Sequence, residues 1–501
     1  MSDITVKATP SQVPLVLGID VGTSAVRSML FDQAGRVIQG TEANEAYKFD
    51  LSQAGAAEVA ADLLLESIFA SLDATLAKAG RLAGQIRGVG SSTFVTNILG
   101  VGRDGRAVTP VYAYSDTRAE EDAANLRAQL DEAAVHDRTG CRIHTSYLPA
   151  RFVWLSRVNP ERFRRAQRWM SIGEYLFLHL FGKTVVSYSV ASWTGLLDRR
   201  KLDWDEPLLE VLPVGAGQFS PLVDVDMPLF GLTPDFGRRW PALRNIPWFP
   251  TVGDGAAANV GSGCASPSRR NLSLGSTTAL RMVTEKPGED LPPSLWCYRV
   301  DARRSLVGGA LTEGGNAITW MTSVLNLRNL PSLENALAAM PPDAHGLTVL
   351  PFFAGERSPG WAGDVRAVIS GLSLGTTPLE ILRAELEAIA LRLALVHDDL
   401  AMFAPEPNEL VVTGGAAFHS PALLQIIADA LGRAIRLSTF PEASCRGAAL
   451  LALEALGIRA EADPARELTG PAFHADPDRH RIYRAAQERQ QKLYRRLIAT
   501  G

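Results

Sequence analysis

The chain has 501 residues, of which 46% are hydrophobic and 21% are charged, a composition typical of a folded globular protein and not of a mainly disordered one. Its 50 Lys and Arg residues against 54 Asp and Glu residues give a formal net charge of −4, which excludes a strongly basic nucleic-acid binder and a polyacidic tail protein. No apolar stretch approaches the roughly 20 residues of a membrane span, and residues 1–14 lack a hydrophobic signal core, so we expect a cytoplasmic protein with no membrane partner.

The first predicted unit is an antiparallel meander. Two apolar, β-branched runs, 15–19 and 26–31, are separated by the turn Asp20-Val21-Gly22-Thr23-Ser24. A second turn, 32–36, leads to Val37-Ile38. Apolar runs joined by turns this short form hairpins. The pattern therefore predicts three antiparallel strands at the start of a domain.

Helical and strand patterns alternate after the meander. We predict an amphipathic helix over 56–76, a buried strand over 86–91 and a helix over 117–130. This alternation is typical of a layered α/β domain. Pro, Trp and Gly cluster over 213–250, which indicates a loop-rich approach to a domain boundary.

The first hairpin recurs near the middle of the chain. Residues 271–281 resemble residues 17–27: each has a strand, a Gly/Ser/Thr turn, a second strand and an Arg shortly after the turn. A repeat separated by about half of the chain predicts duplicated domains and not a solenoid. We expect two α/β domains, 1–256 and 257–501, that enclose a cleft.

Clear signals mark the later helices. The capping box Thr377-Pro378-Leu379-Glu380 predicts a long helix to about Met402. Ser420-Pro421 predicts another over 422–431, ended by Gly432, and residues 479–499 read as a surface helix. The four cysteines have neither disulfide-framework nor metal-ligand spacing, so we expect each to be a buried thiol: Cys141, Cys264, Cys297 and Cys445.

The first hairpin turn carries groups suited to a phosphate. Backbone N–H groups of a Gly-containing turn, together with the hydroxyls of Thr23 and Ser24, can cradle phosphate oxygens. The Asp20 carboxylate at its entrance can hold Mg²⁺ through water, and Arg27 can neutralise a transferring phosphoryl group. A plain hairpin turn is the alternative, but the second turn Gly275-Ser276-Thr277 favours two phosphate loops that face each other.

Asp254 lies between two glycines, after an apolar run and before small residues. A carboxylate there can accept the proton of a hydroxyl that attacks a γ-phosphate. Asp is equally suited to cap a helix, and the two roles are compatible.

Two further elements are weaker when taken alone. Glycines in the strand-to-helix turn 413–417 let the backbone approach a nucleotide base or ribose closely. Tyr114-Ser115-Asp116-Thr117-Arg118 offers an aromatic ring, an acid and a base for vicinal hydroxyls, although a helix cap is the simpler explanation. The chain contains no P-loop, HExxH or GxSxG motif.

Taken in order, these elements resemble the FGGY carbohydrate kinases, members of the actin/hexokinase/Hsp70-like ATPase fold. The resemblance spans about 15–457 and is carried by segments 20–24, 114–118, 253–255, 274–277, 309–316, 355–359, 413–416 and 442–449. It implies an α/β protein of two ribonuclease H-like, actin-like ATPase domains with a catalytic cleft between them. The N-terminal domain would bind the sugar and would contain the first phosphate loop. The C-terminal domain would bind ATP.

The resemblance also implies roles for individual residues. Asp254 would be the general base, Asp20 would belong to the Mg²⁺ site, and Asp116, Arg118 and Phe94 would lie at the sugar together with Asp254. The mechanism would be in-line attack of a sugar hydroxyl on the γ-phosphate of ATP, with domain closure excluding water. The implied ATP contacts are Thr23, Ser24, Arg27, Gly275, Ser276, Gly315, Asn316, Thr319, Gly414, Gly415 and His419.

Within the family, the segments 138–144, 172–177, 189–192, 202–205 and 355–359 resemble gluconokinases. Phe94-Val95 stands where gluconokinases and xylulokinases usually carry Met-His, so a kinase for xylulose, ribulose, sedoheptulose or erythritol is an alternative to a gluconate kinase. A non-catalytic sugar sensor is a third hypothesis, disfavoured because Asp20, Thr23 and Asp254 are all present. The expected partner is a small sugar or sugar acid, and we expect no nucleic-acid partner. The protein can be a monomer or a homodimer.

Overall fold

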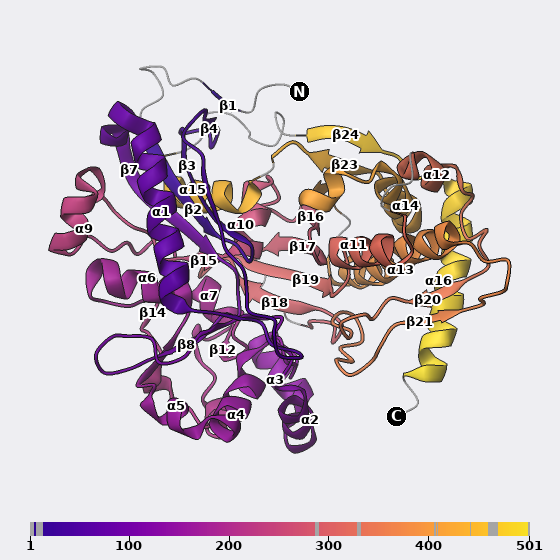
Figure 1. Cartoon of the computed structure of the whole chain (residues 1–501), viewed down its shortest axis with the longest axis horizontal. Coiled ribbons are helices and arrows are strands. Elements are labelled where there is room, and N and C mark those ends of the chain that lie inside the picture. The colour runs from indigo at the N-terminus through magenta and orange to yellow at the C-terminus, as the bar shows by residue number, and fades with distance from the viewer. Residues whose placement is uncertain are drawn as a thin grey trace.

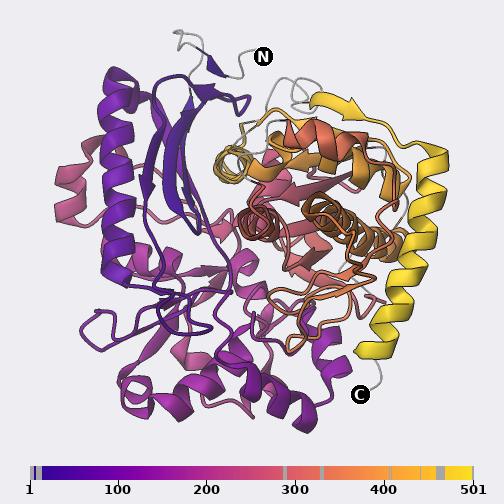
Figure 2. The same ribbon diagram turned by 45° about the vertical axis from the view of Figure 1, so that its right-hand side comes forward.

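The computed structural model describes residues 5–6, 14–285, 290–327, 332–404, 407, 409–440, 442–458 and 469–498. Two lobes, each built on a mixed β-sheet, lie side by side (Figure 1). In the rotated view, the indigo helix α1 lies on one side of the molecule and the yellow helix α16 runs along the opposite edge (Figure 2). Among the described helices, none is both long and apolar enough to cross a bilayer.

The first sheet has the strand order β1-β4-β3-β2-β7-β15, with β5 paired to β3. Strands β2 and β3 form the predicted hairpin, in which Asp20 is opposite Arg27, and β7 runs parallel to β2. The antiparallel meander is thereby confirmed. The bounds are β1 (Thr5–Val6), β2 (Leu15–Val21), β3 (Ala25–Phe31), β4 (Val37–Ile38), β5 (Ala43–Ala46), β7 (Ile86–Thr93) and β15 (Val252–Gly253).

The second sheet repeats this arrangement. Its order is β18-β19-β17-β16-β22-β23-β24, with an antiparallel hairpin β16/β17 and a parallel neighbour β22 in the places of β2/β3 and β7. This topology confirms the internal repeat. The bounds are β16 (Arg269–Leu274), β17 (Thr278–Thr284), β18 (Trp296–Arg299), β19 (Ser305–Leu311), β22 (Glu409–Thr413), β23 (Ile435–Ser438) and β24 (Thr469–Phe473).

Both lobes also contain separate two-stranded sheets. They are β6 (Glu58–Val59) with β9 (Val111–Tyr112), β8 (Leu99–Val101) with β10 (Arg168–Met170), β11 (Val186–Ser187) with β14 (Leu222–Val223), β12 (Leu197–Asp198) with β13 (Asp203–Trp204), and β20 (Thr348–Leu350) with β21 (Val368–Ser370).

Helices cover the sheets, and the predicted start and stop signals of the later helices are present. The helix predicted over 56–76 begins only at Ala61, because Glu58–Val59 pair with another strand. The backbone N–H of Glu380 donates to the Thr377 hydroxyl and the Glu380 carboxylate accepts from the Thr377 N–H, which completes the capping box of α13. Gly432 ends α14 in the left-handed conformation. The α-helices are α1 (Ala61–Ala79), α2 (Glu120–Gln129), α3 (Glu132–Thr139), α4 (Leu148–Val158), α5 (Pro160–Arg165), α6 (Ile172–Phe181), α7 (Tyr188–Ser192), α8 (Glu206–Leu209), α9 (Pro234–Arg239), α10 (Asp254–Gly261), α11 (Gly315–Val324), α12 (Leu333–Ala339), α13 (Pro378–Phe403), α14 (Pro421–Leu431), α15 (Ala443–Ala455) and α16 (Pro477–Leu497), and the 3₁₀ helices are η1 (Gly80–Gln85), η2 (Ala216–Gln218), η3 (Pro241–Leu243) and η4 (Gly415–Phe418).

Helix α15, late in the chain, packs against the first sheet. Cys445, Ala449 and Leu453 share one apolar cluster with β2 and β3 residues such as Val16 and Met29. The Arg446 Nε atom donates to the Gly35 carbonyl at 2.8 Å across 411 residues of sequence. The second half of the chain thus completes the core of the first lobe, as the position of α15 beside β2 shows (Figure 1).

Helix α10 packs along α15 at the centre of the molecule. Glycines permit this approach, because a Cβ on Gly447 would lie 1.8 Å from the Ala257 carbonyl oxygen and one on Gly261 would lie 1.8 Å from the Ala443 carbonyl oxygen. The division that we predict between residues 256 and 257 falls inside α10, which is continuous from Asp254 to Gly261.

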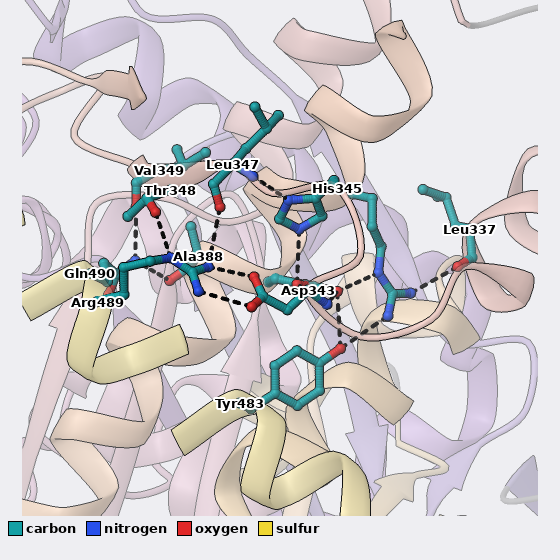
Figure 3. A network of polar contacts seen from close by, with 12 residues as sticks. Leu337, Asp343, His345, Leu347, Thr348, Val349, Ala388, Tyr483, Arg489 and Gln490 are labelled. Carbon is teal, nitrogen blue, oxygen red and sulfur yellow. Dashed lines mark hydrogen bonds and ion pairs between the residues drawn. The ribbon is translucent and has the colours of Figure 1, made fainter. Parts of the chain in front are cut away.

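A polar network fastens α16 to the second lobe (Figure 3). Arg489 pairs with Asp343 at 2.5 Å, and Tyr483 donates to Glu387 at 3.1 Å. Asp343, His345 and Glu387 lie close enough to hold a metal ion. However, His345 Nδ1 accepts from the Leu347 N–H and its Nε2 contacts Glu387, while Arg383 pairs with the same carboxylate. Since these ligand atoms are already engaged within the protein, we assign the cluster to anchoring the helix.

Candidate active site

Three adjoining cavities lie between the lobes. The inner and central cavities share Tyr114, Asp254, Thr277 and Arg281, and the central and outer cavities share Arg27, Gly275 and Ser276. The inner cavity is lined by Val95, Thr96, Tyr114, Ser146, Tyr147, Trp193, Asp254, Thr277, Arg281, Trp296, Tyr298, Ala310 and Arg357. The shared lining residues place the three cavities in a row.

The central cavity is built by the two repeated hairpin turns. Asp20 and Thr23 line it from the first turn, and Gly275 and Ser276 line it from the second. Gly414 closes the far side with φ of +98°, and a Cβ there would lie 2.4 Å from the Leu274 carbonyl oxygen. Only glycine fits this contact, which brings the turn after β22 against the second hairpin.

Three carboxylates face this central cavity: Asp20, Asp254 and Glu442. The Ser92 hydroxyl donates to Asp20 at 2.7 Å, and Arg27 lies 3.7 Å from Asp20 and 3.3 Å from Glu442. Burial raises the pKa of Asp20, and burial together with the charge of Asp20 raises the pKa of Glu442 to about 6. Asp20 is buried, whereas Asp254 and Glu442 are half-buried. Neighbouring carboxylates that repel one another favour a cation among them, and their oxygens are the ligands that Mg²⁺ takes.

Asp254 lies where the inner and central cavities meet. It is the first residue of α10, after the N-cap Gly253, and its Oδ1 atom accepts from the Gly255 N–H at 2.7 Å. Burial, and then the charge of Asp20, raise the pKa of Asp254 to about 7, against the opposing effect of Arg281. A carboxyl group with this pKa can accept a proton near neutral pH.

Aromatic rings and two arginines form the walls of the inner cavity. Tyr298 stacks on Trp193 and on Trp296, with ring centroids 3.7 and 4.3 Å away, and the two indole rings lie 5.5 Å from each other. The Arg357 guanidinium lies over the Tyr114 ring at 5.9 Å. Flat apolar faces with charged groups at defined points are typical of sites for polar small molecules.

The outer cavity opens beside the start of α11. The N–H of Gly315 donates to the Gly275 carbonyl at 2.8 Å, which joins the first turn of this helix to the second hairpin. Trp320 and Val324 line the cavity and remain 51% and 61% exposed, an apolar surface suited to a nucleotide base. The remaining lining residues are Ser24, Arg27, Ser276, Asn316, Thr319, Ser323, Gly415 and Ala416.

Most of the predicted site residues come together in these cavities. These residues come from five elements. Two were predicted to bind phosphates, one to accept a proton and two to bind the nucleoside. The central cavity holds Asp20, Thr23, Arg27, Asp254, Gly275, Ser276 and Gly414, and the outer cavity adds Ser24, Gly315, Asn316, Thr319 and Gly415.

Asp116 and Arg118 lie elsewhere in the first lobe. Arg118 pairs with Asp116 and with Glu58, each at 2.6 Å, and its guanidinium covers the Trp154 ring at 4.6 Å. Asp116 also accepts from the Ala57 N–H at 3.1 Å. Neither residue lines any of the three cavities, so their sugar-binding role remains a prediction while their visible contacts are structural.

Phe94 and His419 are also outside the lining of the three cavities. Phe94 is fully buried with its ring edge-on to Phe49 at 5.8 Å, and the neighbouring Val95 lines the inner cavity in its place. His419 is exposed after η4.

Several lining residues had no assigned role in the sequence analysis: Trp193, Arg281, Trp296, Tyr298, Trp320, Arg357 and Glu442. A signal existed for Arg281, because it is the Arg that follows the second hairpin turn as Arg27 follows the first. In the structure, Arg27 pairs with Asp20, whereas Arg281 donates to the hydroxyl of Ser273, the residue at the equivalent place in the repeat.

Comparisons with known proteins show which proteins this chain resembles. Residues 15–261 match the N-terminal domain of the FGGY family of carbohydrate kinases, and residues 271–456 match the C-terminal domain. A gluconokinase of Bacillus subtilis (strain 168) is 26% identical over 477 residues, covering 92% of this chain and 91% of that protein. A glycerol kinase of Leptothrix cholodnii is 30% identical over 477 residues, covering 92% and 94%.

Solved structures show the same fold. A gluconate kinase from Lactobacillus acidophilus superposes with a TM-score of 0.87 at 22% identity, covering 97% of this chain and 99% of that chain. Plasmodium falciparum glycerol kinase with ADP gives a TM-score of 0.83 at 20% identity, covering 97% and 99%.

Proposed function

This chain belongs to the FGGY family of carbohydrate kinases, and on that basis we propose that it transfers the γ-phosphoryl group of ATP to a hydroxyl of gluconate or a related open-chain sugar acid. The observation that carries the proposal is the position of Asp254, which alone among the carboxylates of these cavities lines both the inner and the central one. An acceptor in the inner cavity presents its hydroxyl to this carboxylate. ATP then places its phosphates in the central cavity and its adenosine in the outer cavity.

The reaction follows from these positions. The acceptor oxygen attacks the γ-phosphorus in line, its proton passes to Asp254, and the bond from the γ-phosphorus to the bridging oxygen breaks to release ADP. Arg27 and Arg281, which line the central cavity, offset the negative charge of the phosphates. The turn N–H groups at Thr23 and Ser276 act in the same way.

Asp20 and Glu442 are the residues that fit Mg²⁺. Both are carboxylates of the central cavity, and burial raises the pKa of each. Mg²⁺ bound there would neutralise charge on the β- and γ-phosphates. The sequence predicts this role for Asp20. Glu442 is a second candidate because it lines the same cavity.

Gluconate is favoured as the acceptor on two grounds. The proteins named gluconokinase in Bacillus subtilis and Bacillus licheniformis are each 26% identical to this chain over most of its length. The inner cavity also carries two arginines against one carboxylate. We place the reaction in the cytoplasm, where ATP is available, with the enzyme as a monomer or homodimer.

A neutral ketose or polyol is the second candidate. The glycerol kinase of Leptothrix cholodnii is 30% identical to this chain, and Val95 lines the inner cavity at the position where gluconokinases and xylulokinases usually carry a histidine. A sugar sensor without turnover is less supported, because Asp20, Thr23 and Asp254 all line the central cavity.

Acceptor-dependent ADP release from ATP and Mg²⁺ tests the proposal. The panel is gluconate, xylulose, ribulose, sedoheptulose, erythritol and glycerol, with an acceptor-free reaction as the blank. We expect the highest kcat/KM for gluconate. Turnover confined to neutral acceptors would favour the second candidate, a ketose or polyol kinase, over a gluconate kinase. No turnover with any acceptor would contradict kinase activity toward sugars, sugar acids and polyols of this kind.

A further inference from the structure

The inner cavity contains an excess of hydrogen-bond donors. Four buried N–H groups have no partner among the described residues: Nε of Arg281, Nε of Arg357, and the indole Nε1 atoms of Trp193 and Trp296. All four side chains line this cavity, and guanidinium and indole groups donate but cannot accept. Leaving buried donors without acceptors is costly. The walls of the inner cavity are therefore rich in donors and positive charge, which suits a ligand with acceptor oxygens.

Arg357 keeps its positive charge available to this cavity. Among the residues that the structure describes, no carboxylate forms an ion pair with it, and its guanidinium lies 5.9 Å from the centre of the Tyr114 ring. The adjacent Glu356 is held away by Arg392, by the Tyr494 hydroxyl at 2.7 Å and by the Gly360 N–H at 3.2 Å. Glu356, the acid next to Arg357 in sequence, therefore binds side chains of α13 and α16 and does not neutralise Arg357.

Arg281 adds a second charge at the same cavity. Its counterpart in the repeat, Arg27, is offset by Asp20 and Glu442, but Arg281 is hydrogen-bonded to the uncharged Ser273 hydroxyl. Asp254 is the acid whose charge acts on it. Arg281 and Asp254 line both the inner and the central cavity, whereas Arg357 lines the inner cavity alone.

We propose that Arg357, assisted by Arg281, binds the carboxylate of an open-chain sugar acid and so selects sugar acids over neutral sugars and polyols. The inference rests on the proposed function and assigns its specificity to a named residue. A planar guanidinium matches a carboxylate with paired hydrogen bonds. The acceptor then has its acid group at Arg357 and its reacting hydroxyl at the junction marked by Asp254.

The test compares two acceptors with the same six-carbon chain, gluconate and glucitol, which differ only in the terminal carboxylate. Each is assayed with wild type, Arg357→Gln, Arg357→Lys and the control Arg366→Gln, which alters an exposed arginine nine residues later outside the cavity lining. We expect Arg357→Gln to lower the ratio of kcat/KM for gluconate to that for glucitol by about 100-fold, mainly through the KM for gluconate. Arg357→Lys should recover about tenfold of this loss, and Arg366→Gln should leave the ratio unchanged.

Further measurements separate the possible failures. ATP binding and the thermal midpoint check that each variant is folded, and an unchanged ratio in a folded Arg357→Gln variant would overturn the proposal. Calorimetric titration of gluconate in the absence of ATP does not depend on turnover. If wild type phosphorylates no acceptor, the proposed function fails, yet gluconate binding that is lost in Arg357→Gln still supports the carboxylate site. Absence of gluconate binding by wild type overturns it.

Discussion

Asp20 near the end of β2 and Asp254 at the start of α10 line one cavity, and the charge of Asp20 raises the pKa of Asp254. The parallel strands β2, β7 and β15 bring them together, because both carboxylates lie at the carboxyl ends of this part of the sheet. One carboxylate is thus suited to a metal ion and the other to a proton.

Replacing Asp254 by Asn should remove phosphoryl transfer while ATP still binds. The amide cannot accept the proton of the acceptor hydroxyl, and we expect kcat to fall by about 10³-fold or more. Acceptor-dependent ADP release measures the loss, and ATP titration by calorimetry checks the nucleotide site. Appreciable residual turnover in a folded variant would exclude Asp254 as the general base.

The pH dependence of kcat/KM should show an acidic limb near pH 7. Asp254 must be ionised to accept a proton, and burial with the charge of Asp20 raises its pKa to about 7. Activity should therefore fall as the pH is lowered through that value. Because Arg281 opposes the shift, Arg281→Met should move the limb to higher pH. A limb that moves to lower pH in this variant would contradict the assignment.

Gly447→Ala should destabilise the protein although alanine favours a helix. The added Cβ would meet the Ala257 carbonyl oxygen at 1.8 Å and push α15 from α10. We expect the free energy of unfolding to fall by about 3 kcal/mol in urea denaturation. The control is Gly84→Ala in η1, an exposed position with no heavy atom within 4 Å, where the change should be small. Equal stability of the two variants would contradict the close packing of these helices.

Glu385 should make stability depend on pH. It is buried on α13, neither carboxylate oxygen has a partner among the described residues, and burial followed by the charge of Glu313 raises its pKa from 4.5 to about 8. Folding therefore takes up a proton between these values, and wild-type stability decreases as the pH rises through them.

The variant Glu385→Gln does not titrate and lacks this loss. From pH 4 to pH 8.5, the difference in free energy of unfolding should shift in its favour by a few kcal/mol, measured by denaturant titration. A difference that stays constant with pH would show that the folded protein does not hold this carboxyl group protonated.

Trp320→Ala should weaken nucleotide binding. The indole lines the outer cavity and is half exposed, so it offers a flat face to a base. We expect about a tenfold rise in the KM for ATP with little change in the KM for the acceptor. A rise in the acceptor KM alone would place the nucleotide elsewhere.

Local sequence signals predicted the elements that carry the site. The hairpin turn at Asp20, its echo at Gly275 and the capping box at Thr377 each depend on residues close together in sequence, and each is present in the structure. Apart from His419, the residues predicted to contact the phosphates and the nucleoside line the central and outer cavities, and their roles as ATP contacts stay predictions.

The inner cavity could not be predicted in this way. Trp193, Arg281 and Arg357 come from segments far apart in sequence, and their approach depends on how the lobes pack. Conversely, Asp116 and Arg118 look like a ligand loop in sequence, yet Glu58 and the ring of Trp154 engage Arg118 within the lobe. A charged pair in sequence does not show whether its partner is a ligand or the protein itself.

The placement of α15 sets the order in which the protein can be completed. During synthesis, β2 and β7 leave the ribosome early, but the helix that covers them and the Arg446 contact to Gly35 arrive only with residues 443–455. The apolar face of the first sheet can therefore be covered by α15 only late in translation. Any chimera that exchanges halves between relatives must carry its own α15 with the first sheet.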